Sequence, residues 1–497
     1  MNRIRSASVA AACLLALAAP AGAAANSGPA YWESSPSFSM TPLEDCPVQV
    51  DSETLTFDFS KGLKSVDQYS PAAAVTADYK MANPTAKPLT VQMAFPLIAS
   101  LADLSQMNGI VITADGNDVP FRIAPGRAVT DVYSQPVYYD SSGSLVKTTL
   151  PSFDAILQSV KEEKPALKRF AGKGKLYRVS YDGHDASVLA SFGPAGKDLA
   201  VLATAANGVS QSGSGLQVEG YVQKTLPPLG VEAAPPFSLL VFGSQAEPII
   251  TVSPEDDGSQ QASKAAAASS AGGAPGVSAG WSVQTGEEDA QAYVNTLVKR
   301  SAVYQKYPTQ DLLNRLTWVI LKNAEESAEG GSPVFSDSSV YDFYNQARVI
   351  VLAYEVTLPA NATTDVSVKY PIGGTMDSRS TAQPSYTYGY LLSPAKGWAS
   401  FKDLSIYIFP PAGNPYVTKS SVPLETDGSG NYSASLKTLP ENDLVFSIYP
   451  KEAAEPKGPA AIRPNLIAAL IFIVLLGVVL AVAGIRRPGH INRGPMP

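Results

Sequence analysis

The sequence predicts a mainly β fold with some α-helix, built from two immunoglobulin-like β-sandwich domains, a helical hairpin between them and a C-terminal transmembrane helix. Three observations support this prediction. Apolar and polar residues alternate in two separate parts of the chain, a helical period occupies the region between them, and an uninterrupted apolar run lies near the C-terminus. The resulting organisation is a signal peptide (1–25), a strand-rich N-terminal domain with one helix (30–255), a low-complexity linker (256–280), a helical segment (281–332), a C-terminal β-sandwich (333–450), a stalk (451–465), a transmembrane helix (466–485) and a basic cytoplasmic tail (486–497).

Residues 1–25 match the pattern of a secretory signal peptide. Arg3 and Arg5 precede an apolar stretch over residues 9–19, and small residues follow it. This stretch is too short to span a bilayer, and cleavage after Ala23 or after Ala25 satisfies the small-x-small rule. We therefore expect the rest of the chain to be exported.

The N-terminal domain begins with half-buried strands. Apolar residues alternate with polar ones over residues 55–59, 75–81 and 89–95. The turn-forming residues 83–88 join the last two strands, and Pro96 ends the second because proline cannot donate to a strand ladder. Shorter alternations predict further strands over residues 177–181, 216–218 and 239–241.

Three helices are predicted among these strands. The first follows Ser152 and covers residues 153–160, because its apolar residues recur at the i, i+3, i+4 and i+7 positions. The second is predicted from Thr285 and Glu288, which have the spacing of a capping box. Pro308 separates it from a third helix, which Thr309 can cap and which ends at Gly330 and Gly331. We expect the second and third helices to form the hairpin.

The C-terminal β-sandwich repeats the earlier strand pattern. A strand over residues 350–358, a polar turn and a return strand over 366–370 resemble the arrangement that precedes Pro96. The alternation continues over 386–390 and 404–408. These patterns predict a second sandwich of the same type.

The apolar run over residues 466–485 predicts a membrane anchor. Twenty helical residues extend roughly 30 Å, which matches the hydrocarbon thickness of a bilayer. Arg463 precedes the run, and Arg486 and Arg487 follow it directly. The positive-inside rule places the basic tail in the cytoplasm. We therefore expect a single-pass protein of the cell membrane with its N-terminus outside.

The cysteine content and charge restrict the compartment and the partners. After signal removal, Cys46 is the only cysteine, so no intrachain disulfide can form, and a bacterial cell envelope is favoured. Without the five arginines of the signal and tail, 32 basic residues face 44 acidic ones, which gives a formal charge of about −12. This balance argues against binding to nucleic acid.

No motif assigns a catalytic, cofactor-binding or metal-binding residue. His184 is the only histidine of the exported part, and its Gly and Asp neighbours favour a loop over nucleophilic catalysis. The count of His and Cys excludes a zinc cluster. The acid-rich turns at residues 115–118 and 256–258 lack the calcium-loop spacing. A hydrolase that uses only carboxylates stays open, because Asp and Glu are plentiful.

Two features suggest ligand contacts. Trp398 follows Lys396 and Gly397 and could stack on a sugar ring, although burial at the end of a sandwich is the favoured alternative. A basic cluster could contact phosphate-bearing polymer or lipid, but interleaved Glu162 and Glu163 favour a solvated face. Its members are Lys161, Lys164, Lys168, Arg169, Lys173, Lys175 and Arg178.

The region from Tyr386 to Pro411 resembles uncharacterised bacterial single-pass surface proteins. The resemblance rests on the tyrosine alternation over 386–390, the segment around Trp398 and the strand over 404–408. It implies a signal peptide, a β-sandwich ectodomain and a C-terminal span. It transfers no function and no site residue.

The sequence therefore favours a non-enzymatic, membrane-anchored extracytoplasmic protein that binds or scaffolds in the bacterial envelope, with an envelope protein or glycan as its partner. No cofactor is expected, and the oligomeric state is left open. The alternatives are an envelope hydrolase with paired carboxylates and an accessory subunit of a membrane sensor or transporter complex.

Overall fold

The computed structural model describes most of the chain between residues 22 and 456. The described segments are 22–33, 39–63, 70–106, 109–128, 138–139, 145–147, 152–161, 164–181, 186–194, 198–213, 215–222, 236–243, 247–254, 281–346, 348–378 and 380–456. The fold over these residues is mainly β with several sheets, as the sequence predicts.

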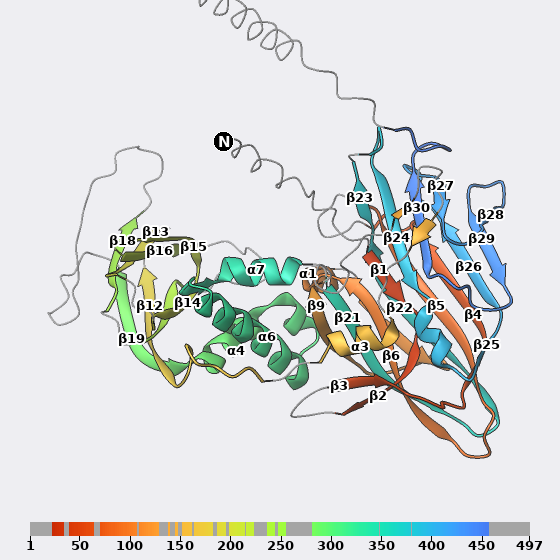
Figure 1. Ribbon diagram of the computed structural model, residues 1–497, viewed down its shortest axis with the longest axis horizontal. Helices are drawn as coiled ribbons and strands as arrows, with labels where there is room; N and C mark the ends of the chain where they lie inside the picture. The colour runs from red at the N-terminus through yellow and green to blue at the C-terminus, as the bar shows by residue number, and fades with distance from the viewer. Residues whose placement is uncertain are drawn as a thin grey trace, which may run out of the picture.

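Two large sheets form one side of the molecule (Figure 1). The first sheet consists of β1 (Gly22–Ala25), β2 (Gly28–Glu33), β3 (Ser39–Pro42), β6 (Leu89–Ala99), β9 (Phe121–Ala128), β21 (Arg348–Leu358), β23 (Thr375–Asp377), β24 (Ser385–Leu391), β27 (Tyr416–Ser420) and β30 (Leu444–Tyr449). The second consists of β4 (Gln49–Asp58), β5 (Ala72–Asn83), β7 (Val111–Ala114), β8 (Asn117–Asp118), β22 (Ala362–Gly373), β25 (Ser400–Phe401), β26 (Leu404–Phe409), β28 (Glu425–Thr426) and β29 (Tyr432–Leu436).

Aromatic side chains join the facing surfaces of these two sheets. Phe57 of β4 meets Phe446 of β30 edge to face, with ring centroids 5.0 Å apart. Phe95 of β6 meets Tyr370 of β22 in the same way at 5.1 Å. The alternating burial along β4 and β22 follows the two-residue period that the sequence shows, because successive strand residues point to opposite faces.

The strand pairing differs from the predicted division into an N-terminal domain (30–255) and a C-terminal β-sandwich (333–450). β21 pairs with β6 along its whole length, β22 pairs with β5, and β26 pairs with β4 in parallel. Strands from both predicted domains thus share the same two sheets. Alternation specifies which face of a strand is buried, but it does not specify which distant strand is its partner.

The immunoglobulin-like layout predicted from the sequence is not seen in these sheets. They contain ten and nine strands, and β1 pairs with β24 in parallel. An immunoglobulin domain has seven to nine antiparallel strands in all. β1 also covers residues that the sequence assigns to the end of the signal peptide.

A smaller unit consists of two further sheets. One contains β12 (Lys173–Tyr181), β14 (Ala200–Thr204), β17 (Ser238–Phe242), β19 (Trp281–Asp289) and β20 (Val334–Ser336), and the other contains β13 (Ala186–Phe192), β15 (Ala206–Ser212), β16 (Gly215–Val222) and β18 (Ile249–Pro254). Val179, Leu216 and Leu239 belong to the apolar core of this unit. A separate short pair joins β10 (Tyr138–Tyr139) and β11 (Leu145–Lys147).

A layer of helices lies between the small unit and the large sheets (Figure 1). It contains α4 (Ala290–Arg300), α5 (Ala302–Lys306), α6 (Gln310–Glu329) and α7 (Asp337–Asn345), and α1 (Leu101–Gln106) packs against α5 and α7. α3 (Phe153–Ser159) covers the outer face of the first large sheet through Ile156 and Leu157. The short 3-10 helix η1 (Ser393–Gly397) precedes Trp398.

The predicted helix N-termini follow the capping rules at two of three positions. Ser152 caps α3 and Thr309 caps α6, each by accepting a hydrogen bond from a first-turn amide, as predicted. The capping box at Thr285 and Glu288 is wrong, since both residues lie in β19. Asp289 caps α4 instead, with its carboxylate 2.8 Å from the amide of Ala292. The predicted hairpin forms, because α4 packs along α6.

Among the residues that the structure describes, no helix is long and apolar enough to cross a membrane. The predicted span over residues 466–485 lies outside them, as do Arg463, Arg486 and Arg487.

Candidate functional site

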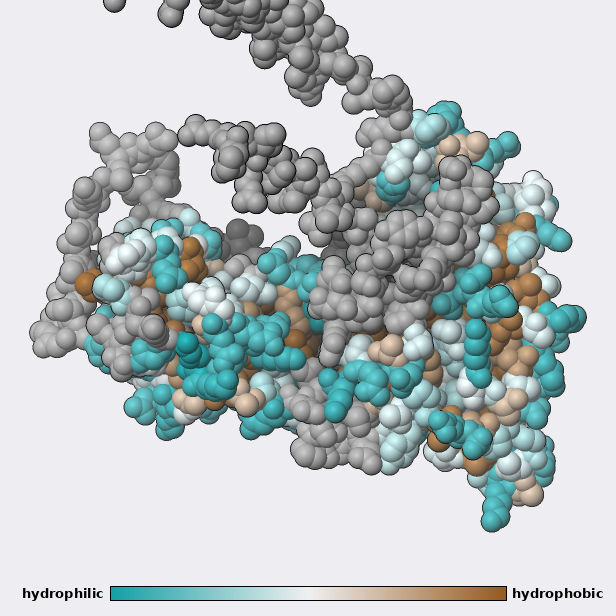
Figure 2. All heavy atoms as spheres, in the orientation of Figure 1, coloured by the Kyte–Doolittle hydropathy of each residue, from teal (hydrophilic) through white to brown (hydrophobic). Residues whose placement is uncertain are grey.

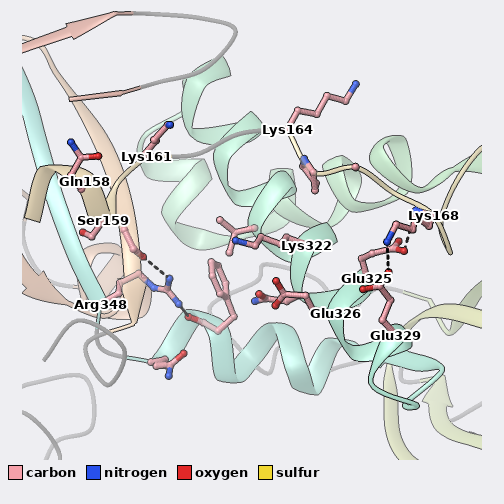
Figure 3. A pocket seen from close by; sticks show the side chains of 17 residues that line it. Gln158, Ser159, Lys161, Lys164, Lys168, Lys322, Glu325, Glu326, Glu329 and Arg348 are labelled. Atoms are coloured by element: carbon pink, nitrogen blue, oxygen red, sulfur yellow. Dashed lines mark hydrogen bonds and ion pairs between the residues drawn. The ribbon is translucent and has the colours of Figure 1, made fainter. Parts of the chain in front are cut away.

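A cavity of about 1060 Å³ lies at the junction between the helical layer and the large sheets (Figure 3). Its walls come from the end of α3, the connector that includes residues 161 and 164–168, one face of α6, the end of α7 and the adjoining ends of β9 and β21. In the orientation of Figure 2, hydrophilic residues gather over the helical layer. The cavity therefore lies where several chain segments meet.

The α6 wall is formed by charged residues on one helical face. Lys322, Glu325, Glu326 and Glu329 line the cavity, and their spacing of three and four residues brings them to one side of the helix. The opposite face of α6 carries the buried residues Leu316, Ile320 and Ala324. An amphipathic helix thus packs into the core and presents its polar face to the cavity.

Glu325 fixes the connector that forms the facing wall. Its side chain is buried, with 6% exposure. Its carboxylate accepts hydrogen bonds from the backbone amides of Lys168 at 3.0 Å, Arg169 at 2.8 Å and Phe170 at 3.4 Å. The ring of Phe170 is buried against Phe242. Glu325 therefore acts as a clamp for the connector.

An ion pair closes one end of the cavity. The Lys168 ammonium donates to the Glu329 carboxylate at 2.9 Å. This hydrogen bond and the attraction between the two charges lower the pKa of Glu329 and raise the pKa of Lys168. Both side chains are exposed, so the pair contributes little to stability.

Arg348 joins three elements at the base of the cavity. Its guanidinium donates to the carbonyl of Gly126 in β9 at 3.1 Å and to that of Phe343 in α7 at 2.7 Å. The guanidinium also lies 3.9 Å from the centre of the Phe343 ring. Arginine suits this position because its planar fork donates in several directions while it stacks on an aromatic face. This residue thus holds one end of β21 against α7.

We expect Glu325→Ala to lower the free energy of unfolding by about 2 kcal/mol, because three backbone amides, including that of the buried Phe170, lose their acceptor. The matched control is Glu326→Ala on the same helix, whose side chain is exposed. Chemical denaturation gives the stability change. Hydrogen exchange should show faster exchange at the amides of residues 168–170 in the first variant only. Equal stability and exchange in both variants would contradict the clamp role.

The basic cluster that the sequence indicates is divided by the fold. Lys161, Lys164 and Lys168 line the cavity. Lys175 forms an ion pair with Glu247, and Arg178 donates to Glu288 at 3.2 Å across the sheet. The cluster therefore contributes its first part to the site and its second part to ion pairs of the small unit. Glu162 and Glu163 lie outside the described residues.

Trp398 does not line the cavity. It is 5% exposed, and its indole nitrogen donates to the carbonyl of Ser27 at 2.9 Å. This placement matches the alternative of a buried residue at the end of a sandwich. The acid-rich turn at residues 115–118 connects β7 to β8, where Asp115 accepts from the Asp365 amide at 2.9 Å. His184 and residues 256–258 lie outside the described residues.

Sequence reasoning missed Lys322, Glu325 and Arg348. The charged side chains of α6 recur at helical spacing, and that signal could have identified the face. Arg348 begins an apolar strand, and nothing in its neighbourhood predicts the long-range contact with Gly126.

Among the described residues, Glu53 and Asp443 are carboxyls with a raised pKa, and both lie outside the cavity lining. Burial between the two large sheets raises the pKa of Glu53 to about 7. Burial also raises the pKa of Asp443, whose carboxylate accepts from the amides of Leu392 and Ser393. Among the described residues, no group of three His, Cys, Asp or Glu side chains is placed to hold a metal ion.

Known proteins provide little further information about this site. No protein-family model and no curated protein matches the chain. Among solved structures, one match is a protein of Legionella pneumophila that is provisionally described as nutrient binding. It has 8% sequence identity and a TM-score of 0.30, and the match covers 87% of this chain and 72% of that one. At this distance the similarity assigns no function.

Proposed function

We propose that this protein is an extracytoplasmic binding protein that takes its ligand in the cavity between α6 and the connector that includes residues 161 and 164–168. Membrane attachment through residues 466–485 is part of the proposal and rests on the sequence pattern described above. The partner is a component of the bacterial envelope that presents a small molecule or a short polymer segment to the cavity.

The observation that carries the proposal is the position of the cavity. The chain passes between the large sheets and the rest of the molecule at two places near it, through the connector after α3 and through the end of α7 into β21. A ligand there would contact segments that belong to both parts. Ligand sites are commonly found at such junctions, and the size of the cavity is at the upper end of the range for small-molecule sites.

The positions and hydrogen bonds of the carboxylates favour a binding role over hydrolysis. A paired-carboxylate hydrolase needs one acid with a raised pKa beside the substrate. The raised carboxyls of Glu53 and Asp443 lie outside the cavity lining. Within the lining, Glu325 is engaged by three backbone amides and Glu329 by Lys168. Two of the three acids that line the cavity thus hold its walls in place.

A tryptophan scan of α3 tests the proposal. Gln158→Trp places a large side chain at the cavity wall, whereas Ala155→Trp changes an exposed residue of the same helix that does not line the cavity. The full-length protein in detergent would be screened by thermal unfolding against neutral sugars, amino acids, organic acids and phosphate esters. We expect at least one class to raise the midpoint for the wild type and for Ala155→Trp, but not for Gln158→Trp. A response that persists in Gln158→Trp, or no response to any class, would contradict the proposal.

A further inference from the structure

We infer that the ligand of the cavity is an organic anion that carries a phosphate or carboxylate group held between Lys322 and Lys164. This inference rests on the proposed function and adds the chemical class of the ligand.

The lining is richer in positive than in negative charge. Five cationic residues line it, and three acidic ones do. The protein as a whole has a formal net charge of −7, so a basic lining runs against its general composition. A local excess of one sign in a concave site concentrates ligands of the opposite sign.

Two of the three acids in the lining are also engaged by other groups of the protein. Glu325 accepts from three backbone amides, and Glu329 is paired with Lys168. Within the described part of the chain, Lys164 and Lys322 form no ion pair. Two lysines of the described lining, Lys164 and Lys322, therefore carry a positive charge outside any ion pair, and one acid, Glu326, carries a negative charge.

Lys164 and Lys322 come from opposite walls. Lys322 reaches from α6 across the cavity in the direction of Arg348, whereas the side chain of Lys164 on the connector points away from Lys322 (Figure 3). Both are exposed and have flexible four-carbon stems, so Lys322 can contact an anionic group as it lies and Lys164 can turn toward the same group when the ligand binds. The buried guanidinium of Arg348 adds a fixed positive charge at the base, where burial strengthens electrostatic attraction.

The cavity is much larger than an inorganic anion. Val319, Pro165, Ala166 and Phe343 line it beside the charged groups. An apolar lining of this kind packs against the organic body of a ligand, while a few polar groups orient it. We therefore expect the anionic group to be attached to a body of at least sugar size.

The inference is tested with four probes on the full-length protein in detergent: glucose 6-phosphate, glucuronate, glucose and inorganic phosphate. We expect titration calorimetry to show binding of the two sugar acids, weaker binding of inorganic phosphate and none of glucose. Lys322→Gln should weaken binding of the sugar acids about tenfold, and Lys164→Gln about threefold, since each removes a charge-assisted hydrogen bond. Lys299→Gln on α4, an exposed lysine outside the cavity, should leave binding unchanged.

Each alternative outcome is informative. Equal binding of glucose and glucose 6-phosphate, lost in Gln158→Trp, would overturn the anionic class and leave the binding role intact. Binding of the sugar acids that survives both lysine substitutions would overturn the assignment of the two lysines. No binding of any probe, together with no thermal response to any compound class, would overturn both the inference and the proposed function. Selectivity between glucose 6-phosphate and glucuronate would distinguish phosphate from carboxylate as the anionic group.

Discussion

Trp398→Ala is expected to lower the free energy of unfolding by about 4 kcal/mol, because it removes a large aromatic side chain from a close-packed core. The indole is 5% exposed and belongs to the main apolar cluster. Its N–H donates to the carbonyl of Ser27 at 2.9 Å, and the substitution leaves that buried carbonyl without this donor. Trp398 thus links the beginning of the described chain to the segment that follows η1.

Two further variants separate packing from ligand contact. Trp398→Phe keeps most of the apolar volume and loses the N–H donor, so its destabilisation should be smaller than that of alanine. Tyr407→Ala removes an aromatic side chain that is 40% exposed on β26, and its effect should be below about 1 kcal/mol. Denaturant unfolding would measure all three. If Trp398→Ala kept its stability but lost ligand binding, the residue would be a ligand contact, as one interpretation of the sequence suggests.

The second large effect is a loss of stability with rising pH, caused by Glu53. Its side chain is fully buried between the two large sheets, and burial raises its pKa from 4.5 to about 7. Between these values the folded protein keeps the proton that the unfolded chain has lost. The stabilisation is therefore complete below about pH 4.5, declines as the pH rises to about 7 and is lost above it, a change of about 3 kcal/mol.

Polar side chains surround Glu53. Asn26 donates to one carboxyl oxygen at 2.5 Å, and the hydroxyl of Tyr390 donates to the other at 2.9 Å. Tyr79 is hydrogen-bonded to Tyr390 at 3.1 Å. These bonds favour the charged carboxylate, but desolvation outweighs them, so the carboxyl is held near the midpoint of its titration at neutral pH.

Glu53→Gln isolates this effect, because glutamine has nearly the same shape and cannot ionise. We expect the wild type and the variant to differ little near pH 4.5 and the variant to be more stable by about 3 kcal/mol near pH 8. Urea denaturation across this range measures the difference. Glu355→Gln, at an exposed residue of β21, should show no such divergence. Parallel stability profiles for wild type and Glu53→Gln would show that Glu53 is not protonated in the folded state.

The sequence predicted element types well where local physics decides them. Alternation identified β4, β5, β6, β21 and β22, and the apolar spacing after Ser152 identified α3. Thr309 marked the start of α6, because a capping side chain interacts only with amides of the first turn. The error at Thr285 has a local cause as well. A capping-box spacing also fits an exposed strand, and pairing with β12 turned residues 281–289 into β19.

The sequence predicted only one wall of the site. Lys161, Lys164 and Lys168 were recognised as a basic cluster, whereas their opposing wall on α6 was not. Charged residues on one helical face look the same whether they face solvent or a cavity. Which of the two applies depends on what packs opposite, and here the connector clamped by Glu325 decides it.

The sequence by itself determined the mainly β class, the helical hairpin and the acidic balance, because composition and short-range periodicity fix these properties. Only the tertiary structure decided that the two strand-rich halves share sheets, that Trp398 and Glu53 are buried, and that Lys164 and Lys322 lie on walls of one cavity. The physical reason is that these features depend on contacts between residues that are far apart in the chain. Such contacts arise from the packing of complementary faces, which no local pattern encodes.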